Sequence, residues 1–283
     1  MKSKKLRLIV GALVVMMMGA TLTGCGGSNE ESGDAGTETQ TTISISGSTS
    51  VGPLMLKVQE KYEAANSGVT LEVQENGSGA GIKDVINGVS EIGMSSRELK
   101  SEEASQVDGT VIAHDGIALL VNPANKVENI TLEQIKDIYT GKITNWSEIE
   151  GGNDKEIVVA AREDGSGTRD AFQELIGFTS EELIENALIS NGNGGLKVMV
   201  ERNENAIAFV SFEYLDDLVN IVNVEGIEPK ADSVRSGEYK ISRPFLLVTR
   251  EDNLSENGQK LIDYILSDEG QKIVVDNKLI PVK

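Results

Sequence analysis

The chain has 283 residues and a formal net charge of -19, with 45 acidic against 26 basic residues. Such a charge excludes partners that bind by long-range attraction to a positive protein surface, namely nucleic acids and anionic membrane faces. With a single histidine and a single cysteine, the sequence also offers little for a transition-metal site or for Ser-His and Cys-His catalysis. We therefore expect no metal and no cofactor.

The first 24 residues have the features of a secretory signal. Four basic residues precede an apolar run that extends to Leu22, and this run is shorter than the ~20 residues that a membrane-spanning helix needs. The tetrapeptide LTGC, which ends at Cys25, resembles the lipobox of bacterial lipoproteins. We expect residues 1–24 to be removed and Cys25 to carry a lipid that anchors the protein to the membrane. The alternative is a signal cleaved elsewhere, or not cleaved, with an incidental cysteine.

Residues 25–41 form a predicted tether. They consist mainly of Gly, Ser, Thr and acidic residues, so they cannot bury enough apolar surface to offset the entropy of ordering. The remaining residues, roughly 240, are enough for one large domain or two modest ones. Because the mature chain can form no internal disulfide, its fold must depend on a hydrophobic core.

A strand, a polar turn and a helix follow one another four times along the rest of the chain. Ile43 and Ile45 alternate with polar residues as in a strand, and the turn 48–50 precedes apolar residues at helical spacing. The strand pattern VTLEVQE, residues 69–75, is followed by the turn NGSGAG, which contains Ser78, and by a second helical pattern. Both turns combine hydroxyl groups with glycine.

The third and fourth junctions add arginine to this pattern. In SEIGMSSRELK, a short strand is followed by Ser96 and Arg97, and in REDGSGTRDAF, residues 162–172, the turn follows the strand pattern EIVVAA. The residues of the fourth junction with suitable donors are Arg162, Ser166, Gly167 and Thr168.

The segments outside the junctions also have recognisable patterns. In NITLEQIKDIY, Thr131 and Gln134 have the spacing of a capping box at a helix start, and Trp146 is expected to pack beneath this region. The segments AIAFVSFEYL and ISRPFLLVT predict strands, and SENGQKLIDYILSDEGQKIVV predicts terminal helices. The chain therefore belongs to the α/β class.

Polar junctions of this kind suit an anion. In an α/β sheet they lie at the carboxyl ends of the strands, where ligands bind, and helix N-termini there offer unpaired N–H groups. Serine and threonine are neutral donors, so an acidic protein can hold an anion with them. The guanidinium of Arg162 suits a tetrahedral oxyanion, and we expect an ion pair with Asp164 to hold it in place. The alternative is that each serine or threonine is an ordinary N-cap.

Residues 43–250 resemble a known family, the phosphate-binding lipoproteins of bacterial phosphate ABC importers, often called PstS-type. The motifs that carry the resemblance occur in the family's order and are SGSTSVGPL, NGSGAGIKDV, IGMSSRELK, IYTGKITNW and REDGSGTRDAF. The resemblance implies an α/β, two-lobed periplasmic-binding-protein fold, type II-like, with a hinge and an interlobe ligand cleft. It implies a discontinuous first lobe, 42–118 with 242–283, and a second lobe, 119–241.

The resemblance also implies a function. Members of the family capture inorganic phosphate between the lobes and deliver it to the permease subunits of an ABC transporter. This chain would then act as an extracytoplasmic monomer at the outer face of the cytoplasmic membrane. The ligand-binding residues carried over by motif are Ser48, Thr49, Ser50, Ser78, Ser96, Arg162, Ser166, Gly167 and Thr168. At the position of Ser50, some relatives have an aromatic residue whose backbone makes the contact.

Ser96 departs from the family pattern. Many relatives have an aspartate there, which accepts the proton of hydrogen phosphate and rejects sulfate, because a buried carboxylate would face a fully deprotonated anion. Serine supplies no such repulsion. Either another acceptor replaces the aspartate, with Asp115 as the candidate, or the selectivity is weaker. Arg97 either contacts the ligand or pairs with an acid.

Two other functions are open from the sequence. A binder of sulfate, molybdate or tungstate would suit a site that has donors and no acceptor. An extracellular phosphohydrolase would need an activated nucleophile or a metal cluster, and the sequence has neither a histidine pair nor a carboxylate cluster of metal-ligand type near the turns. We therefore expect a binding protein rather than an enzyme.

Overall fold

The computed structural model describes residues 40–283. The predicted signal, Cys25 and the predicted tether up to residue 39 lie outside the described residues. In chain order, the first elements are β1 (Thr41–Gly47), α1 (Gly52–Ala65), β2 (Val69–Glu75), α2 (Ser78–Ile86), β3 (Ile92–Ser95), α3 (Ser101–Ala104) and β4 (Asp108–Val121).

The later elements continue the alternation of strands and helices. They are β5 (Asn129–Ile130), α4 (Leu132–Tyr139), η1 (Trp146–Glu148), β6 (Val158–Arg162), α5 (Gly167–Ile176), η2 (Ser180–Glu182), β7 (Leu188–Ser190), α6 (Gly192–Arg202), β8 (Ala206–Ser211), η3 (Phe212–Tyr214), β9 (Asn220–Val224), α7 (Ala231–Arg235), β10 (Ser242–Thr249), α8 (Glu256–Leu266) and α9 (Asp268–Asp276). The predicted α/β class is confirmed.

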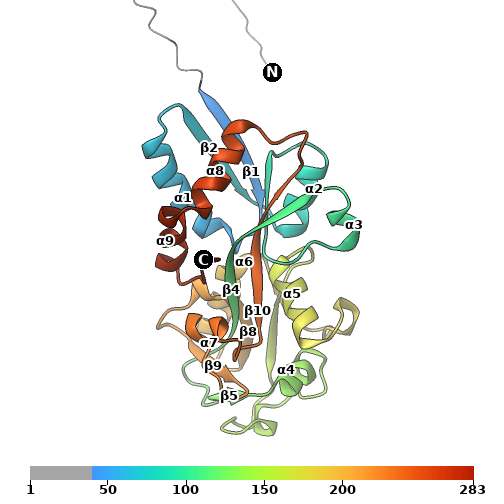
Figure 1. Cartoon of the computed structure of the whole chain (residues 1–283). Coiled ribbons are helices and arrows are strands. Elements are labelled where there is room, and N and C mark those ends of the chain that lie inside the picture. Colours follow the sequence, from blue (N-terminus) through green and yellow to red (C-terminus); the bar gives the residue numbers. More distant parts are fainter. Residues whose placement is uncertain (1–39) are drawn as a thin grey trace, which may run out of the picture. The chain divides into compact units, whose positions relative to one another are not determined.

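One continuous path of strands runs through these elements, in the order β2-β1-β3-β10-β4-β8-β6-β7. β1 is parallel to β2 and β3, and β6 is parallel to β7 and β8. Between these two parallel groups, β10 pairs antiparallel with β3 and with the first part of β4. The last part of β4 pairs antiparallel with β8 and β9. In Figure 1, β4 and β10 run side by side between the two groups of elements.

The apolar side chains form two large clusters that divide within β4. The first core contains Ile112 and Ala113 together with residues from β1, α1, β3, β10, α8 and α9. The second core contains Ile117 and Ala118 together with residues from α4, β6, α5, β8 and β9. β4 therefore contributes to both cores and connects them.

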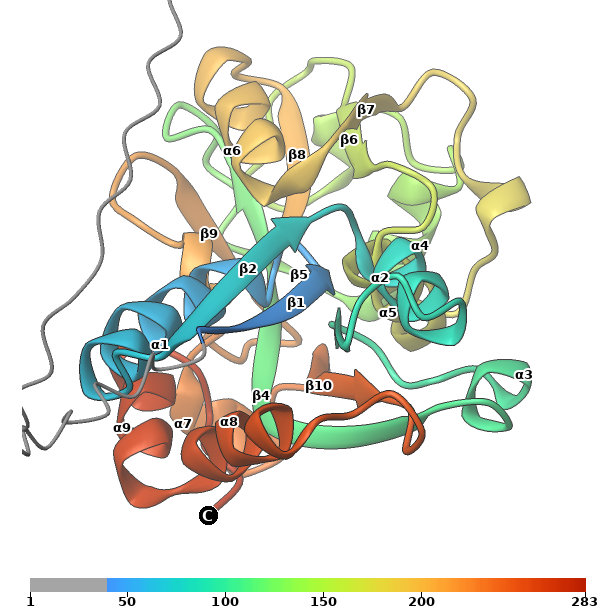
Figure 2. The ribbon, with the colours of Figure 1, turned by 90° about the horizontal axis from the view of Figure 1, so that it is seen from above.

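Helices cover the two ends of the sheet separately. α1, α8 and α9 pack on one another beside β1, and Figure 2 shows these three helices together on one side of that strand. On the second core, Phe172 of α5 stacks on Phe209 of β8 with ring centroids 4.1 Å apart. Among residues 40–283, no helix is both long enough and apolar enough to span a membrane.

Local signals in the sequence have their expected partners. Thr131 accepts a hydrogen bond from the backbone N–H of Gln134, and the side chain of Gln134 accepts one from the N–H of Thr131, so the predicted capping box is confirmed. Trp146 is fully buried in the second core, and its indole N–H donates to the carbonyl of Asn205 over 2.9 Å. This hydrogen bond satisfies the polar atom that burial of a tryptophan would otherwise leave unpaired.

Candidate functional site

The four polar turns meet in one place. The hydroxyl oxygens of Ser50, before α1, and Thr168, in the first turn of α5, lie 2.8 Å apart. Those of Ser78, at the start of α2, and Ser96, after β3, lie 3.2 Å apart. Positions as far apart in the chain as 50 and 168 therefore contribute to a single cluster of hydroxyl groups, which we call the hydroxyl cluster: Thr49, Ser50, Ser78, Ser96 and Thr168.

The backbone of the fourth turn lies directly against the second turn. The N–H of Gly79 donates to the carbonyl of Gly165 over 3.1 Å. A Cβ atom at Gly167 would lie 2.2 Å from the hydroxyl oxygen of Ser78 and 2.8 Å from that of Ser96. Only glycine fits at 167, because any side chain there would displace two members of the hydroxyl cluster.

Arg162 lies at the end of β6 with 1% of its surface exposed. Its Nη2 atom donates to the hydroxyl of Thr49 over 3.0 Å, and its Nη1 atom lies 3.5 Å from that of Thr168. The carboxylate of Glu163 accepts from Nε and Nη2 over 2.8 and 2.7 Å. Arg162 is therefore a buried cation that contacts the hydroxyl cluster directly and is held by one carboxylate.

The prediction that Asp164 forms an ion pair with Arg162 is wrong. Asp164 is 90% exposed and pairs with Arg169 over 2.7 Å. Glu163 takes its place, since it follows the last residue of β6 directly. Burial raises the pKa of Glu163, but the hydrogen bond and charge of Arg162 outweigh burial, and the pKa lies below its usual value. The carboxylate therefore stays ionised beside Arg162 at neutral pH.

Groups that can only donate fix the direction of several hydrogen bonds in the hydroxyl cluster. The backbone N–H of Ser96 donates to the hydroxyl oxygen of Ser78 over 3.1 Å, and Arg162 donates to that of Thr49. A hydroxyl whose oxygen accepts in this way keeps its own proton for another acceptor. The arrangement thus presents hydroxyl groups as donors, which is what an oxyanion requires.

Ser48 and Ser166 have a different local role from the hydroxyl cluster. The hydroxyl oxygen of Ser48 accepts from the N–H groups of Ser50 and Val51 over 3.1 and 3.3 Å. The hydroxyl oxygen of Ser166 accepts from the N–H of Arg169 over 3.3 Å and caps α5. Both side chains therefore hold the turns in shape, as N-cap residues do.

Arg97 pairs with acids. It donates to both carboxylate oxygens of Glu103 over 2.7 and 2.9 Å, and its Nε donates to Asp170 in α5 over 2.9 Å. Burial raises the pKa of Glu103, but the hydrogen bonds and the charge of Arg97 have the larger, opposite effect. The pKa of Glu103 therefore lies below its usual value. The sequence left open whether Arg97 contacts the ligand or pairs with an acid, and in the structure it pairs with two acids.

Asp115 is fully buried at the point where β4 passes from the first core to the second. Its Oδ2 atom accepts from Nε and Nη2 of Arg243 over 3.2 and 2.9 Å. Its Oδ1 atom accepts from the hydroxyl of Ser211 over 3.0 Å and from the N–H of Phe212 over 3.2 Å. Burial raises the pKa of Asp115, and the charge of Arg243 opposes this effect. Each oxygen therefore already accepts two hydrogen bonds.

One buried residue beside the hydroxyl cluster was missed by the sequence analysis. Asn193, in the first turn of α6, donates from Nδ2 to the hydroxyl of Ser50 over 2.9 Å. It belongs to the stretch SNGNGG, residues 190–195, which follows β7 and precedes a helix in the same way as the four junctions. This fifth polar junction was the signal that could have found it.

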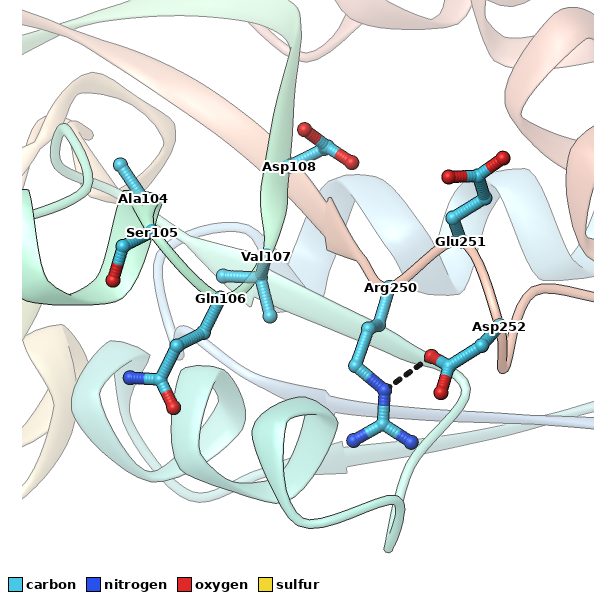
Figure 3. A pocket seen from close by; sticks show the side chains of 8 residues that line it. All are labelled: Ala104, Ser105, Gln106, Val107, Asp108, Arg250, Glu251 and Asp252. Carbon is cyan, nitrogen blue, oxygen red and sulfur yellow. Dashed lines mark hydrogen bonds and ion pairs between the residues drawn. The ribbon is translucent and has the colours of Figure 1, made fainter.

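Two open pockets differ in their relation to this cluster. One, of about 620 Å³, lies between the segment that joins α3 to β4 and residues 250–252, which follow β10. Figure 3 shows that Arg250 is paired there with Asp252, whereas the side chains of Asp108 and Glu251 point away from its guanidinium. The other, of about 510 Å³, is lined by Thr49, Glu163, Asn193 and Tyr214, among others. Of these two pockets, only the second borders the hydroxyl cluster.

Within residues 40–283, no group of three or more potential metal-ligating side chains occurs.

Donors from turns at the carboxyl ends of parallel strands, on a sheet with two separate cores, define the class of two-lobed solute-binding proteins. A family model described as a PBP superfamily domain matches residues 32–269. The phosphate-binding protein PstS of Bacillus subtilis (strain 168) is 33% identical over an alignment of 292 positions, which covers 100% of this chain and 95% of that protein.

Solved structures agree with this match. A putative phosphate ABC transporter substrate-binding protein from Clostridium perfringens, solved with bound phosphate, is 55% identical with a TM-score of 0.84, and the match covers 86% of this chain and 100% of that one. An ABC-type phosphate transport receptor from Vibrio cholerae is 37% identical with a TM-score of 0.74, over 85% of this chain and 100% of that one. The chain belongs to the PstS family of phosphate-binding proteins within the PBP superfamily, and the predicted periplasmic-binding-protein fold is confirmed.

Proposed function

We propose that the protein captures inorganic phosphate between two lobes and delivers it to the permease subunits of an ABC transporter. The first lobe comprises residues 42–118 with 242–283, and the second comprises 119–241. The observation that carries the proposal is the meeting of Thr49 and Ser50, from the first lobe, with Arg162 and Thr168, from the second. The relative from Clostridium perfringens, solved with bound phosphate, supports it.

The groups that we propose to bind phosphate are the hydroxyl cluster, the guanidinium of Arg162 and the backbone N–H of Gly167. Ser48 and Ser166 hold their turns in shape. Each hydrogen bond from these donors to a buried dianion contributes roughly 1.5–3 kcal/mol. Because the two lobes supply different donors, the anion is fully coordinated only when both are in place, and separation of the lobes releases it. We propose no turnover, since the relatives are named as binding and transport proteins.

The test is a direct binding measurement. The purified chain is freed of retained ligand by unfolding and refolding, and is then titrated calorimetrically with phosphate, with sulfate, molybdate and tungstate as competitors. Saturable binding of one phosphate that the other anions displace poorly is the expected result. A chain that binds sulfate or molybdate but not phosphate contradicts the proposal.

The lipid anchor at Cys25 is proposed from the lipobox-like sequence, since residue 25 lies outside the described part of the chain. The same signal leads us to propose a location at the outer face of the cytoplasmic membrane. We also propose that the protein acts as a monomer, with residues 25–41 as its tether. The name of the relative from Clostridium perfringens, a substrate-binding protein of an ABC transporter, supports the extracytoplasmic setting.

Substitution of Ser96 by aspartate tests the departure from the family pattern. Ser96 is buried 3.2 Å from Ser78, at the position where a carboxylate would face the anion. We expect Ser96→Asp to weaken sulfate binding at least about tenfold more than phosphate binding, because only phosphate brings a proton for the new carboxylate. The measurement is the ratio of the two dissociation constants. Ser96→Asn is the uncharged control, and an equal ratio in both variants contradicts the placement of Ser96.

The ion pair between Arg97 and Asp170 joins the two proposed lobes. Since Glu103 also holds Arg97, Asp170→Asn removes the negative charge from the interlobe contact without leaving the buried guanidinium unpaired. We expect a faster release of phosphate, by about two- to tenfold for a contact worth ~0.5–1.4 kcal/mol, measured by stopped-flow fluorescence. The control is Asp216→Asn, whose pair with Lys197 lies within the second lobe. Equal release rates in the two variants contradict the role of Asp170.

A further inference from the structure

We propose that Asn193 is a positioning residue, which fixes the hydroxyl of Ser50 as a hydrogen-bond donor toward the bound anion. The inference rests on the proposed function, because it concerns how the same site recognises phosphate. Asn193 and Ser50 are both fully buried, and they come from the second and the first proposed lobe. Their hydrogen bond is therefore one of the contacts between the two lobes.

The orientation of the Asn193 amide follows from a neighbour that can only donate. The backbone N–H of Ser211, at the end of β8, donates to Oδ1 of Asn193 over 3.2 Å. The oxygen of the amide must therefore face Ser211, and the NH₂ group must face Ser50, whose hydroxyl oxygen it reaches at 2.9 Å. A flipped amide would set two donors against each other at Ser211.

The direction of the Ser50 hydroxyl follows in turn. A serine hydroxyl has one proton, and Asn193 uses a lone pair of the oxygen. The proton of Ser50 is then free to be donated to a group other than Asn193. The hydroxyl oxygen of Thr168 lies 2.8 Å away, and either hydroxyl can be the donor of that pair. Thr168 also lies 3.5 Å from Nη1 of Arg162, so the hydroxyl of Ser50 lies close to the buried cation. This is where we place the anion.

The support behind Asn193 is rigid. The hydroxyl of Ser211 donates to Asp115, and Asp115 is paired with Arg243. These three residues belong to β8, β4 and β10, which are neighbours in the sheet, and β4 connects the two cores. Asn193 is thus held against the connecting strands and contacts Ser50 only when the first lobe is in place, so the hydroxyl acquires its direction when the lobes meet.

The experiment is a double-mutant cycle on the full chain. Phosphate affinity is measured by calorimetry for the wild type, Asn193→Ala, Ser50→Ala and the double variant, with thermal unfolding of each. We expect Asn193→Ala to weaken binding about tenfold, and the double variant to bind no more weakly than Ser50→Ala alone, because Asn193 acts through Ser50. Asn186→Ala, an exposed change in the same lobe, is the control and leaves the affinity unchanged. Losses that multiply independently contradict the inference.

A second variant covers the case in which Asn193→Ala does not fold. Asn193→Asp keeps the acceptor for Ser211 but turns the donor toward Ser50 into an acceptor, so the Ser50 proton turns away from the anion. We expect a larger loss of phosphate affinity in the Ser50 background than in the Ser50→Ala background. Equal losses in both backgrounds overturn the inference and leave the proposed function intact. A wild-type chain that does not bind phosphate overturns both.

Discussion

Replacement of Arg162 by alanine will weaken phosphate binding by about a hundredfold or more. The guanidinium is the buried cation that contacts Thr49 and lies next to Thr168, and two charge-assisted hydrogen bonds of ~1.5–3 kcal/mol each account for a loss of this size. The substitution also leaves the carboxylate of Glu163 without its partner close to the anion, which adds repulsion. The dissociation constant measured by calorimetry gives the result.

Three variants make this expectation specific. Arg162→Lys keeps the charge but loses the planar fork, so we expect an intermediate loss. Ser78→Ala removes one neutral donor and should cost less than either change at Arg162. Arg235→Ala, at an exposed ion pair with Asp232, is the control and should not alter the affinity. If Ser78→Ala and Arg162→Ala weaken phosphate binding equally, the assignment of Arg162 as the residue that contributes most to phosphate binding is wrong.

Substitution of Asp115 by asparagine will lower the free energy of unfolding by roughly 3–5 kcal/mol, because it leaves Arg243 as a buried and uncompensated charge. We expect the phosphate-over-sulfate ratio to stay unchanged, since both carboxylate oxygens already accept two hydrogen bonds within the protein. Chemical denaturation measures the first quantity, and competition binding on the folded variant measures the second.

The control for this prediction is an exposed pair of the same kind. Asp232→Asn breaks the surface pair with Arg235 and should change the unfolding free energy by ~0–1 kcal/mol. An Asp115→Asn variant of unchanged stability, but with lost discrimination against sulfate, would refute the structural role. It would instead support Asp115 as the acceptor that replaces the family's aspartate.

The two predictions separate two uses of buried charge in one molecule. The carboxylate of Glu163 accepts from Nε and Nη2 of Arg162. The guanidinium still contacts Thr49 through Nη2 and lies near Thr168 through Nη1. At Asp115 and Arg243, the pair lies where the strands connect the two cores, and its hydrogen bonds hold backbone and side chains of β8 and η3. The first arrangement suits a ligand, and the second suits a fixed hinge.

Local sequence signals predicted much of the fold. The alternation of Ile43 and Ile45, the helical spacing after each polar turn and the capping box at Thr131 depend on residues close together in the chain, and the structure has the expected strands and helix starts. Glycine in the fourth turn has a structural reason, because Gly167 lies against Ser78 and Ser96; its role as a donor to the anion stays a prediction. These features follow from backbone geometry and local hydrogen bonding.

The partners of charged side chains did not follow from spacing. Asp164 was expected to hold Arg162, yet Glu163 does, because the direction in which a side chain leaves the end of β6 depends on the twist and packing of the strand. Arg97 had two possible roles in the sequence, and only the placement of Asp170 and Glu103 around it decided between them. Asn193 was missed because its role depends on Ser50, 143 positions away in the chain.

The amino-acid sequence by itself determined the strands of the four junctions, the polar turns at their ends, the helices that follow them and the family. Each of these depends on periodicity, on short motifs and on interactions between neighbours along the chain. The tertiary structure alone decided which turns face one another, which carboxylate neutralises which buried arginine and in which direction each hydroxyl donates. The physical reason is that burial in a low dielectric requires each charge and each donor to have a specific partner, and those partners come together only when distant segments pack.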